Sequence, residues 1–113
     1  MRAAIEGGVT IAMGTDAGVG GHGENGRELA LMTEAGMTPM QAIEATTRVP
    51  AEVLRMQDRL GTLAVGKVSD LVALEGDPLA DVGLFRDRSR VRLVIKDGRV
   101  VHDTTRSKVA AGM

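Results

Sequence analysis

The sequence has 113 residues, 43% of them hydrophobic, which suits one compact domain with a modest core. Phe85 is its only aromatic residue, so the core must be built from aliphatic side chains and methionine. A net charge of −1, with no Tyr or Trp, excludes the basic and stacking surfaces that bind nucleic acid. No apolar run is long enough to cross a membrane, and the acid at Glu6 argues against a signal peptide, so we expect a cytoplasmic protein. Without cysteine, disulfides and thiolate chemistry are excluded.

The first predicted element is a buried strand over residues 8–14. Val9, Ile11 and Met13 are apolar and Ala12 is small, a pattern typical of a strand covered on both faces in a parallel sheet. A glycine-rich loop is predicted to follow, because six of the thirteen residues 14–26 are glycine. The start of the chain therefore indicates an α/β layer structure.

Helices are predicted next. The first runs from about residue 26 to 35, with Leu29 and Met32 on one face and Gly36 as its stop. The second begins at a capping box, in which Thr38 is the N-cap and Gln41 the third helical residue. Its predicted apolar face consists of Met40, Ile43 and Thr47. Pro50 is predicted to break this helix and to start a short one through Leu54 and Met56.

The second half of the chain reads as small β elements. Residues 71–74 form a predicted strand, and residues 91–96 and 99–102 form a predicted hairpin. Asp97-Gly98 between the last two is the preferred pair for a two-residue type I′ turn. We therefore divide the chain into a strand-loop-helix part over residues 1–58, a β part over 59–103 and a tail over 104–113.

Two glycine-rich motifs resemble phosphate-binding loops. Residues 18–23 match G-x-G-x-x-G, but the glycines begin too far after the strand for a dinucleotide site. Residues 61–68 fall one residue short of a P-loop, since Val68 replaces the Ser or Thr that would hold magnesium. We therefore interpret the first motif as a flexible loop and the second as a β-turn with Lys67 in solvent.

Asp16 is the leading candidate for chemistry. It follows the predicted strand, at the end where parallel α/β folds build their sites, and a carboxylate there can bind a metal or act as a general base. A turn-forming or capping role is the structural alternative. His22 is a candidate loop contact to substrate or a solvated residue, and His102 is predicted to be structural or solvated. The charged residues Glu24, Arg27 and Glu28 are interpreted first as a helix start and second as substrate contacts.

Several stretches, in order, resemble the amidohydrolase superfamily, in particular its imidazolonepropionase and Xaa-Pro dipeptidase-like branch. Residues 8–16 are similar to the eighth strand of the barrel, and residues 22–43 to the stretch that follows it. Residues 61–78 resemble the return into a β-sandwich, and residues 94–101 its closing hairpin. The resemblance covers residues 5–103.

The resemblance implies the last βα unit of a (β/α)8 barrel, followed by a C-terminal β-sandwich segment, with the barrel incomplete in this chain. It implies a hydrolase of C–N bonds in amides, cyclic amides or dipeptides, in which a divalent ion, zinc or manganese, activates water. Asp16 would be a metal ligand and would carry a proton from that water to the leaving nitrogen.

The sequence departs from the family pattern in lacking the His-x-His pair of the first strand, the bridging lysine and the histidines of the middle strands. A complete barrel needs at least about 200 residues. We therefore expect a hydrolase segment that is active only when the missing barrel is supplied, and we expect that this chain alone does not assemble the metal site. The alternative is a non-catalytic module that folds by self-association as a homo-oligomer. A nucleotide or small-ligand binder ranks third.

Overall fold

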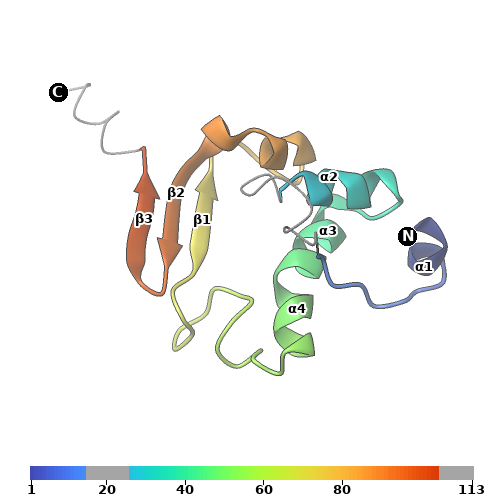
Figure 1. The fold of residues 1–113 in the computed structure, drawn as a ribbon, viewed down its shortest axis with the longest axis horizontal. Coiled ribbons are helices and arrows are strands. Elements are labelled where there is room, and N and C mark those ends of the chain that lie inside the picture. Colours follow the sequence, from blue (N-terminus) through green and yellow to red (C-terminus); the bar gives the residue numbers. More distant parts are fainter. Residues whose placement is uncertain (15–25, 105–113) are drawn as a thin grey trace.

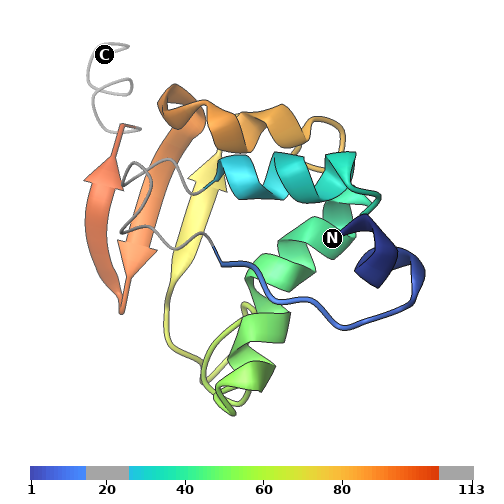
Figure 2. The same cartoon turned by 45° about the vertical axis from the view of Figure 1, so that its right-hand side comes forward.

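The computed structural model describes residues 1–14 and 26–104 (Figure 1). The helical elements are α1 (Arg2–Glu6), α2 (Arg27–Glu34), α3 (Pro39–Thr46), α4 (Arg48–Val53) and the 3-10 helices η1 (Val82–Arg86) and η2 (Arg88–Arg90). The strands are β1 (Leu71–Leu74), β2 (Val91–Lys96) and β3 (Arg99–Asp103). The helices gather on one side and the sheet on the other, and η1 lies along α2 (Figures 1 and 2). Within the described ranges, no helix combines the length and hydropathy that crossing a membrane requires.

The predicted capping box starts α3. The Gln41 amide N–H donates to Thr38 Oγ1 at 3.1 Å, and the Thr38 amide N–H donates to Gln41 Oε1 at 2.9 Å. Pro39 occupies the first turn, where its missing N–H costs nothing. These two hydrogen bonds confirm the predicted capping box. The sequence could predict it because the residues that form it lie within four positions of one another.

The predicted apolar face of α3 is partly wrong. The helix buries Ala42 and Ala45, whereas Met40 is 47% exposed and Thr47 is exposed at the C-cap. Alanines on this face let α3 approach α2 closely, which longer side chains would prevent.

The break between α3 and α4 falls at Thr47, and Pro50 is the third residue of α4. A proline ring clashes with the carbonyl four residues earlier, so the chain leaves helical geometry before Pro50 is reached. The predicted break and short helix are thus present, but Leu54 and Met56 lie beyond the end of α4.

The core lies in the helical half. Leu29, Met32, Ala42 and Ala45 form its buried centre, which we call the core cluster. Met13, Met37, Ile43 and Phe85 pack against this cluster. Leu84 of η1 is only 3% exposed, so the β part also contributes to the interior.

The predicted strand over residues 8–14 is not a strand in the structure. Val9 is 59% exposed, and the backbone amides of Val9 and Met13 donate to the carbonyls of Ala4 and Ala45. A strand needs a neighbour for its ladder of hydrogen bonds. Within the described ranges the three strands of the sheet pair only with one another, so residues 8–14 lack such a neighbour.

The strands form an antiparallel sheet in the order β1-β2-β3, and the predicted hairpin is confirmed. Asp97 and Gly98 have φ of 51° and 76°, both positive as a type I′ turn requires. The turn is tied to the chain before β1. The Asp97 amide donates to Asp70 Oδ1 at 2.7 Å, and the Gly98 amide donates to the Ser69 carbonyl at 3.0 Å.

The sheet has apolar side chains on both faces. Val72 and Val94 are direct partners on one face, whereas Leu71, Ile95 and Val100 share the other. Every strand residue is at least partly exposed, with Val72 at 56%. The sheet therefore contributes two incompletely covered surfaces.

Candidate functional site

Asp16 and His22, the two predicted site residues, lie outside the described residues, together with the G-x-G-x-x-G motif of residues 18–23 and Glu24. The structure does describe the two points between which this segment runs. These are residues 13–14, which precede the segment, and residue 26, which follows it. The structure therefore describes the candidate site through the chain on either side of the segment.

The first of these points is fixed on α3. The Met13 amide donates to the Ala45 carbonyl at 2.8 Å, and the Met13 side chain packs against the core cluster. The chain therefore enters the segment from the buried side of α3.

The second point is the start of α2. Gly26 is the N-cap of this helix, and the Leu29 amide donates to the Gly26 carbonyl at 3.2 Å. Glu28 supplies an acid in the first turn, which suits the positive end of the helix dipole. Arg27 is exposed beside it, so the charged residues described here act as a helix start.

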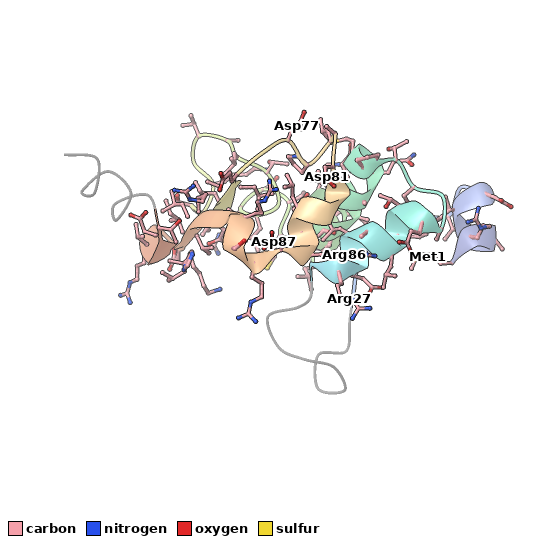
Figure 3. The ribbon with its side chains drawn as sticks, turned by 90° about the horizontal axis from the view of Figure 1, so that it is seen from above. Met1, Arg27, Asp77, Asp81, Arg86 and Asp87 are labelled. Carbon is pink, nitrogen blue, oxygen red and sulfur yellow. The ribbon has the colours of Figure 1, made fainter. Side chains whose placement is uncertain are left out.

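The 3-10 helix η1 comes from the C-terminal half of the chain and packs along α2. Arg86 of η1 lies beside α2 (Figure 3). Its Nη2 atom is 3.1 Å from Oε1 of Glu34, the last residue of α2. Arg2 donates to the Glu34 carbonyl at 2.8 Å. These solvent-exposed contacts link η1 and α1 to the C-terminal end of α2.

The described residues do not by themselves fit a metal ion. No group of three or more His, Asp or Glu side chains among residues 1–14 and 26–104 could hold one. His102 lies on β3, at the far edge of the sheet from α2 (Figure 1), and its Nε2 is 3.1 Å from the Val91 carbonyl oxygen. This placement agrees with the prediction that His102 is structural or solvated.

The near P-loop is a structural turn, but Lys67 is not free in solvent as predicted. Its ammonium donates to the Gln57 carbonyl at 2.6 Å and to Thr62 Oγ1 at 2.7 Å. The Lys67 side chain thus closes its own loop, because two oxygen acceptors replace water around the charge. The next regular element is the strand β1, so no helix N-terminus offers its amides to a phosphate here.

The chain belongs to the amidohydrolase family, whose family model matches residues 1–101. The ochratoxinase of Aspergillus niger is 40% identical over 101 residues, which are 88% of this chain and 21% of that protein. The imidazolonepropionase of Desulfotalea psychrophila is 32% identical over 104 residues, covering 89% of this chain and 25% of that protein.

Solved structures give the same family. A Xaa-Pro dipeptidase with bound methionine in its active site superposes with a TM-score of 0.83 at 44% identity, covering 89% of this chain and 24% of that one. Molinate hydrolase superposes with a TM-score of 0.74 at 34% identity, covering 88% and 25%. The chain thus spans about a fifth to a quarter of the length of these relatives.

These findings confirm the predicted resemblance. Amidohydrolases are a barrel superfamily, and this chain covers a small part of such a fold. Sequence reasoning missed the contribution of η1. The available signal was the single aromatic residue, Phe85, beside Leu84 in a stretch that otherwise carries charges.

Proposed function

We propose that this chain carries the last βα unit of an amidohydrolase barrel, and that Asp16 takes part in hydrolysis of an amide-type bond when the rest of the barrel is supplied. The family match over residues 1–101, with a TM-score of 0.83 to the Xaa-Pro dipeptidase, carries this proposal. The relatives are named for hydrolytic reactions, which favours an amide, cyclic amide or dipeptide as substrate.

The role proposed for Asp16 is proton transfer. Its carboxylate would accept a proton from the attacking water and return it to the leaving nitrogen, as general acid–base catalysis requires. His22, in the same segment, would contact the substrate. Asp16 would also be a ligand of the zinc or manganese ion expected of an amidohydrolase. Because the described residues form no metal-donor set, that ion would need its further donors from the rest of the barrel.

The sheet would form part of a β-sandwich beside the barrel. Its apolar residues on both faces favour a second covering layer, because a three-stranded sheet with both faces in water buries too little apolar area to be stable. We propose a cytoplasmic location and a small-molecule or dipeptide substrate.

The direct test is a chimera in which residues 1–104 replace the matching segment of the Xaa-Pro dipeptidase, which we call the graft. We expect the graft to release proline from a Xaa-Pro dipeptide. The Asp16→Asn substitution should lower its kcat/KM by about 100-fold or more, because the proton acceptor is lost while the side-chain shape is kept. Asp58→Asn, at an exposed aspartate, is the matched control and should retain activity. An active Asp16→Asn graft would refute the proposed role.

The second candidate function is a non-catalytic module that associates with itself. The exposed apolar residues Val72 and Val100 favour it, because a second copy would cover them. Sedimentation would give the oligomeric state, and elemental mass spectrometry after incubation with zinc and manganese would give the metal content. An oligomer that retains no metal after dialysis favours this alternative, whereas about one ion per chain favours a site completed by association.

A further inference from the structure

Asp97 is the only aspartate of the sequence that precedes a glycine. It is exposed at the tip of the hairpin, and among the described residues no hydrogen bond or ion pair holds its carboxylate. A Cβ atom on Gly98 would meet no neighbouring atom within 4 Å, so the space beside the Asp97–Gly98 bond is open. Such a bond is prone to rearrangement, because glycine presents its amide nitrogen to the preceding carboxyl group without steric hindrance.

The rearrangement needs no reactant other than water. The Gly98 amide nitrogen bonds to the side-chain carboxyl carbon of Asp97 and gives up its proton, and a hydroxyl group of the carboxyl leaves with that proton as water. The product is a cyclic imide. One water molecule then adds to an imide carbonyl and breaks the bond from that carbonyl to the Gly98 nitrogen. Cleavage at the side-chain carbonyl restores aspartate, whereas cleavage at the main-chain carbonyl leaves isoaspartate, which has the same mass.

The fold holds both amides of the turn in hydrogen bonds. The Gly98 amide donates to the Ser69 carbonyl at 3.0 Å, and the Asp97 amide donates to Asp70 Oδ1 at 2.7 Å. We call these two hydrogen bonds the turn clamp. Ring closure rotates the Gly98 nitrogen toward the Asp97 carboxyl group and so draws its N–H away from the Ser69 carbonyl. The imide can therefore form only after the turn clamp has opened.

The turn clamp is anchored on both sides. In the chain before β1, the Asp70 amide donates to the Val68 carbonyl at 3.0 Å, and the Val68 amide donates to the Arg59 carbonyl at 2.9 Å. In the hairpin, Lys96 and Arg99 pair directly beside the turn. Opening of the clamp therefore has to separate the hairpin turn from a chain segment that is itself hydrogen-bonded.

We propose that the Asp97–Gly98 bond is a modification site at which isoaspartate forms spontaneously, and that the turn clamp suppresses this reaction in the folded chain. The product would prevent the clamp from closing again, because isoaspartate lengthens the main chain between the two clamped amides. The hairpin would then lose its tie to the chain before β1. This inference is independent of the proposed function, since it involves neither Asp16 nor a metal ion.

The first experiment follows isoaspartate at position 97 in the 113-residue chain during storage at neutral pH. Proteolytic fragments are separated by liquid chromatography, and electron-transfer mass spectrometry distinguishes isoaspartate from aspartate in each. A synthetic peptide of residues 94–101 is the reference without a clamp. We expect isoaspartate in the peptide, and formation slower by about 10-fold or more in the folded chain. A peptide that forms none would overturn the site, and equal rates in peptide and chain would overturn the protection.

The second experiment tests the turn clamp by substitution. Asp70→Ala removes the acceptor of the Asp97 amide and should speed isoaspartate formation by about 3- to 10-fold, as expected for the loss of one hydrogen bond. Asp70→Asn keeps a side-chain oxygen as acceptor and should stay nearer the parent rate. Glu6→Ala is the charge control, since Glu6 is exposed in α1 on the opposite side of the molecule from the hairpin (Figure 1). Equal acceleration in Glu6→Ala and Asp70→Ala would overturn the role of the clamp.

A third measurement needs no variant and covers the case in which Asp70→Ala fails to fold. In the parent chain, urea at concentrations below the unfolding transition should speed hydrogen exchange of the Gly98 amide and isoaspartate formation in proportion, because both need the same opening. The Leu29 amide, bonded to the Gly26 carbonyl, reports on the helical half and should stay protected. Isoaspartate formation that does not follow exchange at Gly98 would overturn the proposed protection.

Discussion

The backbone conformation at position 98 depends on the residue being glycine. Its φ is 76°, and a Cβ atom there would meet no neighbour within 4 Å, so any cost of substitution comes from the backbone alone. Gly98→Val should destabilise the chain by about 1–2 kcal/mol, because a β-branched residue resists the left-handed conformation. Gly98→Asn is the matched control and should cost less, since asparagine tolerates positive φ. Urea unfolding of both variants tests this, and equal stability of Gly98→Val and the parent chain would contradict it.

Asp87 carries the residue-scale prediction for pH. The Ser89 hydroxyl and the Ser89 amide both donate to Asp87 Oδ1, at 2.5 Å and 3.0 Å, and these bonds hold the pKa of the Asp87 carboxyl below its ordinary value. Because folding lowers the pKa of this carboxyl, its carboxylate form stabilises the folded state at pH values above the ordinary pKa. That contribution is lost as the pH falls through the lowered value.

The Ser89→Ala variant tests this pH dependence. It removes the hydroxyl donor, so the pKa of Asp87 should rise toward its ordinary value, as followed by NMR titration of its side-chain carbonyl carbon. The variant should be less stable than the parent at pH values above the ordinary pKa of Asp87, and this difference should shrink as the pH falls through the lowered value. Identical titration curves for Asp87 in the two proteins would show that the hydroxyl does not act on the carboxyl.

At the scale of elements, the capping box of α3 offers a quantitative check. Thr38→Ala removes the acceptor of the Gln41 amide and should cost about 1 kcal/mol of stability. Thr38→Ser keeps the hydroxyl and is the control, with a smaller effect expected. Thermal unfolding measures both, and a Thr38→Ala variant as stable as the Thr38→Ser variant would contradict the capping role.

The sequence correctly predicted the elements that form through interactions between residues close together in the chain. The capping box at Thr38 and the Asp97-Gly98 turn each depend on residues within four positions of one another, and both are present in the structure. Residues 8–14 have the composition of a strand, but strand formation depends on a neighbour, which a pattern within those residues cannot reveal.

The contacts around the candidate site are non-local, and the sequence did not predict them. Gly26 approaches Phe85 across 59 positions of chain, so nothing in the local pattern around either residue announces the contact. The prediction that places Lys67 in solvent is wrong for the same reason, because its carbonyl acceptor at Gln57 lies ten positions away. The role proposed for Asp16 rests on ordered motifs that the chain shares with a family, and not on packing.

At the scale of the whole molecule, packing is uneven. The radius of gyration is 15.3 Å, against about 13 Å for a compact domain of this length. The residues that are buried belong to the helices and to Leu84, whereas each strand residue keeps some exposure. The helical half thus holds its own core, whereas the apolar side chains of the sheet are only partly buried.

This unevenness predicts a hierarchy of local stability in the isolated chain. Amides of β1–β3 should exchange faster than those of α2 and α3, because a three-stranded sheet without a buried face opens at lower free energy than a packed helix pair. Hydrogen exchange at low protein concentration tests this.

In the graft, where a barrel and a second sheet are available, protection of the sheet should rise while protection of α2 and α3 stays similar. If the isolated chain instead covers its sheet with a second copy, sheet protection should rise with protein concentration by mass action. Full protection of the sheet in a dilute, monomeric chain would contradict this hierarchy, since every strand residue keeps some exposure.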